Sequence, residues 1–110
     1  MPEKLEVQLS ALRQRADEDF HHPDAARQPG RHELRLDELG LRVAMTRSRY
    51  PNRPDGVDMY AVTFSRLDMD RAPLESEVRA VLETIFGEAA SEAVERPGGP
   101  LIRMFRVSGS

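Results

Sequence analysis

The segment Leu41–Gly56, LRVAMTRSRYPNRPDG, holds the residues of this chain that are best suited to bind a charged partner. Four arginines occur in it before the first acid, Asp55: Arg42, Arg47, Arg49 and Arg53. Guanidinium groups in such a cluster suit phosphates and carboxylates, because each presents a planar fork of N–H donors. The formal net charge of the 110-residue chain is -3, so the local positive charge stands apart. We predict that an anionic partner docks here.

Three interpretations of this arginine-rich loop remain open. Its arginines pair with nearby acids, or they bind an acidic protein surface, or they bind phosphate while Tyr50 stacks on a base or sugar. The acids in question are Asp55, Asp58, Asp68 and Asp70. A pI of about 5.6 argues against a general nucleic-acid binder, although local charge can suffice. The predicted partner-binding residues are Arg47, Arg49, Tyr50 and Arg53.

Alternation places these arginines within the predicted sheet. Leu41, Val43 and Met45 form the buried side of a strand, and Arg47 and Arg49 continue that side beyond the core. We therefore expect them at the rim of the sheet, beside the turn at 51–56, which suits contact with an acidic partner surface. The opposite, open face then carries small and polar residues, and such a face is either solvated or a pairing surface. They are Arg42, Ala44, Thr46, Ser48, Ala61, Thr63 and Ser65.

A second candidate site lies in the segment His21–Glu33. Three histidines occur in or beside it with acids nearby: His21, His22 and His32, with Asp19, Asp24 and Glu33. Imidazole and carboxylate groups suit divalent metals, but the spacing matches no helical ligand pair such as HExxH. Adjacent loop histidines are more often free in solvent. We predict no metal, no cofactor and no catalytic residue.

Composition narrows the remaining chemistry. The chain has no cysteine, which excludes disulfides and thiolate sites. No G-x-S-x-G motif is present, and Gly98-Gly99 lies between prolines, unlike a phosphate-binding loop. The sequence does not decide whether the protein is an enzyme, and the lack of a catalytic motif favours a protein that is not.

No apolar run is long enough to cross a membrane, and the first residues lack the apolar segment of a secretory signal, so a cytoplasmic location is expected. Lys4 is the only lysine beside many arginines, which is typical of a GC-rich bacterial genome.

The order of periodic segments predicts one α+β domain. We expect a helix at 1–20, a possibly flexible linker at 21–31, a hairpin at 34–45, and a strand at 60–65. A helix from Pro73 to Gly87 and a strand at 101–107 follow, and 88–96 is either helix or strand. The predicted fold is a two-layer sandwich, α-β-β-β-α-(β)-β, with two helices on one face of a mostly antiparallel sheet of four to five strands.

Two further expectations concern packing. Asp17, Glu18 and Asp19 crowd the C-terminal end of the first helix, which the helix dipole disfavours, so that end should fray or meet a cation. Met45 and Met104 are expected in the core. Whether the first helix packs on its own sheet or on another chain stays open.

The sequence favours a small non-enzymatic protein that acts through protein–protein contacts, self-associating as a homodimer, with the arginine tip meeting an acidic partner. The alternatives are nucleic-acid or phosphorylated-ligand binding through the same tip, and a small enzyme or metal protein using the His21–Glu33 segment.

Overall fold

A computed structural model describes residues 2–21, 30–49 and 58–109. The predicted α+β order is confirmed, and the uncertain segment at 88–96 divides between a short 3-10 helix and a strand. The elements are α1 (Glu3–Phe20), β1 (His32–Leu36), η1 (Asp37–Leu39), β2 (Leu41–Arg49), β3 (Asp58–Arg66), α2 (Glu75–Phe86), η2 (Gly87–Glu92), β4 (Val94–Arg96) and β5 (Ile102–Ser108).

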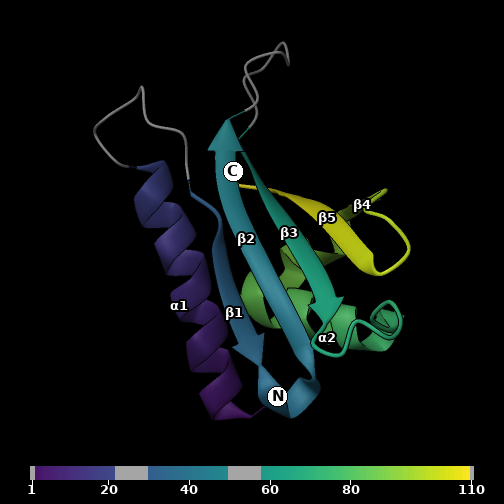
Figure 1. Cartoon of the computed structure of the whole chain (residues 1–110). Helices are drawn as coiled ribbons and strands as arrows, with labels where there is room; N and C mark the ends of the chain where they lie inside the picture. Colours follow the sequence, from purple (N-terminus) through teal and green to yellow (C-terminus); the bar gives the residue numbers. More distant parts are fainter. Residues whose placement is uncertain (1, 22–29, 50–57, 110) are drawn as a thin grey trace.

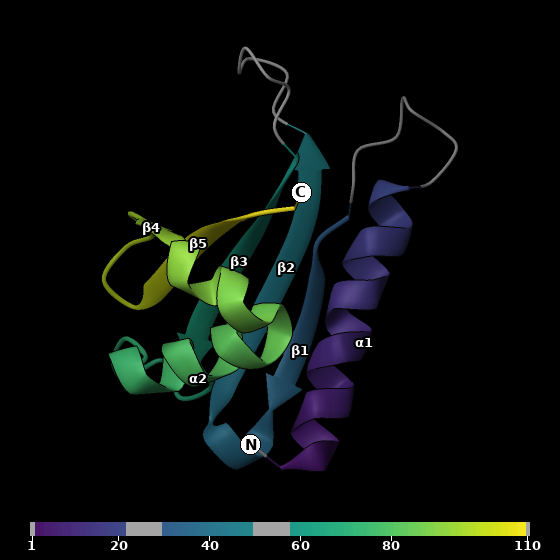
Figure 2. The ribbon, with the colours of Figure 1, turned by 180° about the vertical axis from the view of Figure 1, so that it is seen from behind.

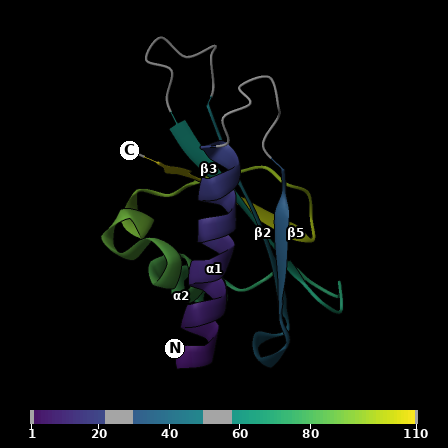
Figure 3. The ribbon, with the colours of Figure 1, turned by 90° about the vertical axis from the view of Figure 1, so that its left-hand side faces the viewer.

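The five strands form one antiparallel sheet in the order β1-β2-β3-β5-β4. The predicted hairpin at 34–45 is confirmed as the antiparallel pairing of β1 with β2. Figure 1 shows the sheet from its open side, with α2 behind it, and Figure 2 shows α2 crossing the other side. Seen along its edge, the sheet has both helices on the same side (Figure 3). The molecule is therefore a two-layer sandwich with one sheet face uncovered.

The core lies between the helices and the sheet. The helices contribute aliphatic residues at helical spacing, and the strands contribute every second residue, as the period of each element requires. Its fully buried members include Leu5, Leu9 and Leu12 of α1, Val78 and Val81 of α2, and Val43, Met45, Tyr60, Val62 and Phe64 of the sheet. Helix α1 contacts β1, β2 and α2 of its own chain.

Two apolar side chains lie outside the core, and one of them, Met104, was expected within it. Leu74 directly precedes the first turn of α2 and is 53% exposed, so the apolar stripe of that helix begins only at Val78. Met104 pairs with Thr63 across β3 and β5, which places it on the open face and not among the buried residues. The predicted end of α2 at Gly87 is confirmed, and this residue has a φ of 61° that favours glycine.

Candidate functional site

Arg47 lies in a cluster of paired charges between the end of α1 and the sheet. Its side chain is 12% exposed. Its Nε donates a hydrogen bond to Asp58 Oδ1 at 3.0 Å, and its Nη1 donates to Asp17 Oδ1 at 2.9 Å. The guanidinium carbon also lies 4.4 Å from the centre of the Phe20 ring. The hydrogen bond to Asp58 holds the pKa of Arg47 above its ordinary value, so this group stays cationic.

Tyr60 extends the cluster to the middle of α1. Its hydroxyl donates to Asp17 Oδ1 and accepts a hydrogen bond from Arg13 Nε at 3.3 Å. Burial, followed by the bond to Asp17, raises the pKa of Tyr60. Arg13 Nη1 also donates to the backbone carbonyl of Ile85 in α2, at 2.9 Å. The cluster therefore connects α1 to both the sheet and the second helix. Of the two outcomes predicted for the acidic end of α1, fraying or contact with a cation, the structure shows contact with Arg47.

The structure brings together only part of the predicted partner-binding set. Arg47 and Arg49 do lie on the side of β2 that carries Val43 and Met45, as alternation predicted. Arg49 is exposed, with its guanidinium carbon 5.5 Å from the centre of the Phe20 ring. Arg47 does not project freely from the rim, because Asp17 and Asp58 already occupy its donors.

Tyr50 and Arg53 lie outside the described residues, as does Asp55. Of the acids that could pair with the loop, Asp58 pairs with Arg47, whereas Asp68 pairs with Arg66 at 3.2 Å. Partner binding by Arg49, Tyr50 and Arg53 stays a prediction. Within the described ranges no buried polar side-chain atom lacks a hydrogen-bond partner, so the Arg47 cluster leaves no buried donor vacant for a ligand.

The predicted histidine and acid segment is only partly assembled. His32 Nε2 lies 3.4 Å from Asp19 Oδ2, and the same carboxylate accepts a hydrogen bond from the Gly30 N–H. Glu33 follows His32 along β1, so it lies on the other face of the sheet, where it pairs with Arg31 at 3.6 Å. His22 and Asp24 fall outside the described residues. Among the residues that are described, no three potential ligands gather to hold a metal.

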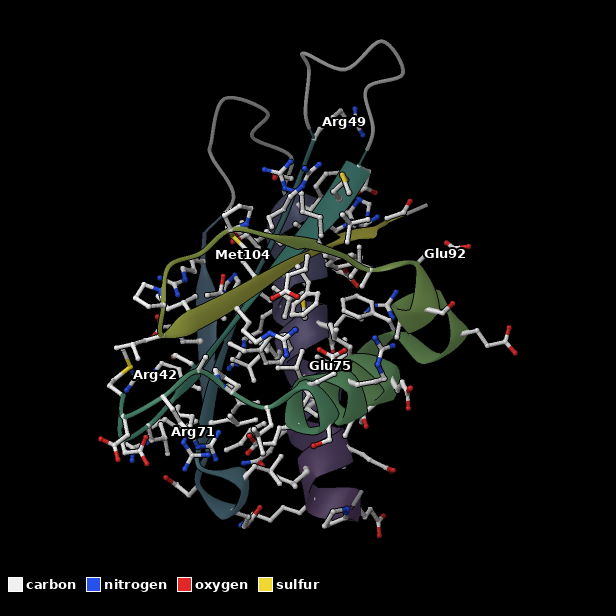
Figure 4. All side chains as sticks on the ribbon, turned by 90° about the vertical axis from the view of Figure 1, so that its right-hand side faces the viewer. Arg42, Arg49, Arg71, Glu75, Glu92 and Met104 are labelled. Carbon is white, nitrogen blue, oxygen red and sulfur yellow. The ribbon has the colours of Figure 1, made fainter. Side chains whose placement is uncertain are left out.

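The uncovered sheet face is the larger candidate surface. The predicted alternate residues of β2 and β3 do lie on it, because their strand partners are the residues opposite to those in the core. Strands β4 and β5 enlarge it with six more side chains: Val94, Arg96, Ile102, Met104, Arg106 and Ser108. In Figure 4, Arg42 and Met104 lie on the side of the sheet away from α2, whereas Glu92 lies on the helical side.

The contribution of β5 to this face is not predictable from the sequence. Its segment, LIRMFRV, has apolar residues at both parities, so hydrophobicity alone does not decide which side is buried. Register decides it: Phe105 pairs with the core residue Val62, and Met104 therefore points to the open side. The one useful signal in the sequence is Phe105, because an aromatic residue is more often buried than a methionine on the opposite side of the same strand. Arg103, which shares the side of Phe105, obscures this signal.

Charge is distributed unequally between the two layers. The strands place four arginines and one acid on the open face: Arg35, Arg42, Arg96, Arg106 and Glu33. Arg35 bonds to Asp37 at 3.2 Å, whereas Arg42 and Arg96 form no ion pair with another described residue. On the helical side, Glu83, Glu88 and Glu92 are exposed at the end of α2 and in η2. The open sheet face is basic and this helical surface is acidic.

Comparison with known proteins gives no relative: no family model, no curated protein and no solved structure matches this chain. Within the described residues, no helix has the length and apolar character needed to cross a membrane.

Proposed function

We propose that the protein is a small non-enzymatic assembly protein that acts through protein–protein contacts, including contacts with further copies of itself. The observation that carries this proposal is the uncovered face of the five-stranded sheet. Arg42 and Arg96 lie on it without an ion-pair partner among the described residues, beside Met104, Ile102 and the half-exposed Val94.

The composition of this face supports a protein partner. Arginine and methionine are enriched at protein interfaces, and flexible thioethers adapt to irregular surfaces. An apolar centre with arginines around it combines buried area with directional hydrogen bonding. A cytoplasmic location belongs to the same proposal, and the absence of cysteine is compatible with it.

Nucleic-acid binding, the first alternative, gains no support from the described part of this face. Sheets that bind single strands stack bases on exposed aromatic rings. Each described aromatic residue lies instead in a helix or on the helix-facing side of the sheet: Phe20, Tyr60, Phe64, Phe86 and Phe105. A labelled oligonucleotide that binds at low salt, and loses affinity in Arg49→Gln/Arg53→Gln, would favour the alternative.

The arginine tip is a second contact in this proposal. Arg47 is bonded to Asp17 and Asp58, so we assign the contact with an acidic partner to Arg49, Tyr50 and Arg53. Double substitution of Arg49 and Arg53 by glutamine should weaken partner binding without changing the free energy of unfolding by more than about 0.5 kcal/mol.

Two measurements test the proposal. The mass from sedimentation velocity should rise between micromolar and millimolar protein. A photo-crosslinking residue at Thr63, on the open face, should form discrete protein adducts in cells, whereas the same residue at the exposed Glu38 of η1 should not. A monomer at every concentration, together with no adducts specific to Thr63, would overturn the proposal.

A further inference from the structure

We infer that copies of the protein associate head to tail: the basic open sheet face of one copy docks on the acidic α2–η2 surface of the next. This inference rests on the proposed function and specifies its partner. The α2–η2 surface is defined by the exposed Glu83, Glu88 and Glu92. The open sheet face is defined by the outward residues of the five strands, and its arginines Arg42 and Arg96 form no ion pair with any other residue that the structure describes.

Charge disfavours the simplest alternative, a symmetric dimer in which two open sheet faces meet. Such an interface places the same patch on both sides of a two-fold axis. It would therefore bring Arg42, Arg96 and Arg106 of one copy towards the same arginines of the other, and like charges across an interface cost several kcal/mol. A contact between different surfaces avoids this repulsion.

The α2–η2 surface is the best complement that the described part of the chain offers. Glu83, Glu88 and Glu92 form no ion pair with another described residue. The nearby Arg79 is already bonded to Glu75 at 3.0 Å. The outer side of α1 also carries Glu3 and Glu6, but its exposed residues include the cations Lys4 and Arg15, which lower its net negative charge.

The shape of the acidic surface suits an arginine. A shallow depression is lined by Glu83, Gly87, Glu88 and Ser91. A side chain added at Gly87 would meet nothing within 4 Å, so the depression is open to an approaching group. Carboxylates at its border can accept hydrogen bonds from a guanidinium inserted between them.

The size of the sheet face predicts a weak contact. Five strands about 4.8 Å apart and about seven residues long give a face of about 550 Å². The two partners together would then bury about 1,100 Å², near the lower limit for a specific interface. Since each contact uses a different surface of each copy, both ends of a dimer remain able to bind, and the assembly grows with concentration.

The test uses two neutral double variants of the full chain. Arg42→Gln/Arg96→Gln disables the sheet face, and Glu83→Gln/Glu88→Gln disables the helical surface. Neutral residues are chosen because charge reversal would create new attractive pairs between the variants. Glu3→Gln/Glu6→Gln, on the outer side of α1, is the matched control. All substituted side chains are at least partly exposed, so urea unfolding should confirm that each variant folds.

In sedimentation velocity, the wild type should form species that grow with concentration and shrink with added salt. Each disabling pair alone should weaken association about tenfold or more, whereas the α1 control should match the wild type. An equimolar mixture of the two disabled variants should form one-to-one dimers and stop there, because each supplies the surface that the other lacks.

Three outcomes overturn the inference. A wild type whose mass stops at a salt-insensitive dimer, with no dimer from the mixture, indicates a symmetric interface and leaves the proposed assembly function standing. If Glu3→Gln/Glu6→Gln loses association, the acidic surface that binds the sheet face lies on α1 and not on α2–η2. A wild type that stays monomeric removes self-association altogether, and the crosslinks from Thr63 then decide whether another protein binds.

Discussion

Arg47 and Arg42 belong to the same strand, yet they lie in opposite environments. Arg47 faces the helices, where Asp17 and Asp58 bind its guanidinium and the Phe20 ring lies beside it. Arg42 faces away from the helices and has no ion pair within the described part of the chain. Because successive strand residues alternate between faces, the parity of a position decides whether its arginine stabilises the fold or remains available to a partner.

The same comparison holds for the methionines. Met45 is fully buried under the helices, whereas Met104 lies on the open face and is partly exposed. The helix-facing side therefore holds the core together, whereas the open side carries Met104 and Arg42 without a helix packed over them. Substitutions matched across the two faces test this difference.

The largest difference is expected between the two methionines. Met45→Ala should lower the free energy of unfolding by about 2–4 kcal/mol, because it removes buried apolar atoms and leaves a cavity. Met104→Ala should cost less than about 1 kcal/mol, since water can reach the site. Urea denaturation of both variants measures the two values. Equal losses would show that the open face is packed as tightly as the core.

The two arginines come next. Arg47→Gln should cost about 2 kcal/mol, because it leaves the carboxylates of Asp17 and Asp58 without their cation in a half-buried site. Arg42→Gln should change stability by less than about 0.5 kcal/mol. In a double-mutant cycle, Asp58→Asn should cost much less in the Arg47→Gln background than in the wild type. Additive losses would mean that the ion pair is not coupled.

Period and parity account for how much of this arrangement is predictable from the sequence. The alternation of Leu41, Val43 and Met45 placed Arg47 and Arg49 on the correct side of the sheet, and Gly87 marked the end of the second helix. These signals are local, because side-chain direction repeats every second residue in a strand and turn chemistry depends on neighbouring residues.

The partners of Arg47 could not be predicted in the same way. Asp17 belongs to a helix that precedes β2 in the chain, and only the packing of α1 on the sheet brings it to the guanidinium. Asp58 was one of several nearby acids, and the antiparallel register opposite Arg49 selects it. The extent of the open face could not be predicted either, because β5 has apolar residues on both of its sides and its sequence does not show which side is buried.

Tyr60 offers a smaller, pH-dependent test of the helix-facing side. Burial and the bond to Asp17 raise the pKa of Tyr60 above its ordinary value of 10.0. The folded state thus holds the phenolic proton more tightly, so this stabilisation is complete below about pH 10 and is lost as pH rises through the folded pKa. In a Tyr50→Phe background, absorbance titration should show Tyr60 ionising above the ordinary range.

Tyr60→Phe supplies the matching control. It should cost about 1 kcal/mol near neutral pH, because the carboxylate of Asp17 loses a donor. At alkaline pH the free energy of unfolding of Tyr60→Phe should also fall less steeply than that of the wild type, because the variant has no phenol to ionise at this position. Ionisation of Tyr60 at or below pH 10 would show that the cluster does not retain its proton.

The smallest effect is expected at Arg103, which links α2 to the edge strand β4. Its Nη2 donates to Glu75 at 2.6 Å, and its Nε donates to Glu95 at 2.9 Å. These bonds lower the pKa of both carboxyls from 4.5. Their stabilisation is therefore present above that value and is lost as pH falls through the lowered pKa. Arg103→Met should cost about 0.5–1 kcal/mol near neutral pH.

The comparison of faces is completed by Arg96→Met, on the open side of β4. This variant should keep the acid dependence of the wild type, whereas Arg103→Met should show a shallower loss of unfolding free energy between neutral pH and the acid range. If the two variants have the same acid dependence, Arg103 does not stabilise the ionised carboxylates of Glu75 and Glu95 in the folded state. Strand β4, which is only three residues long, would then be held by its backbone pairing with β5.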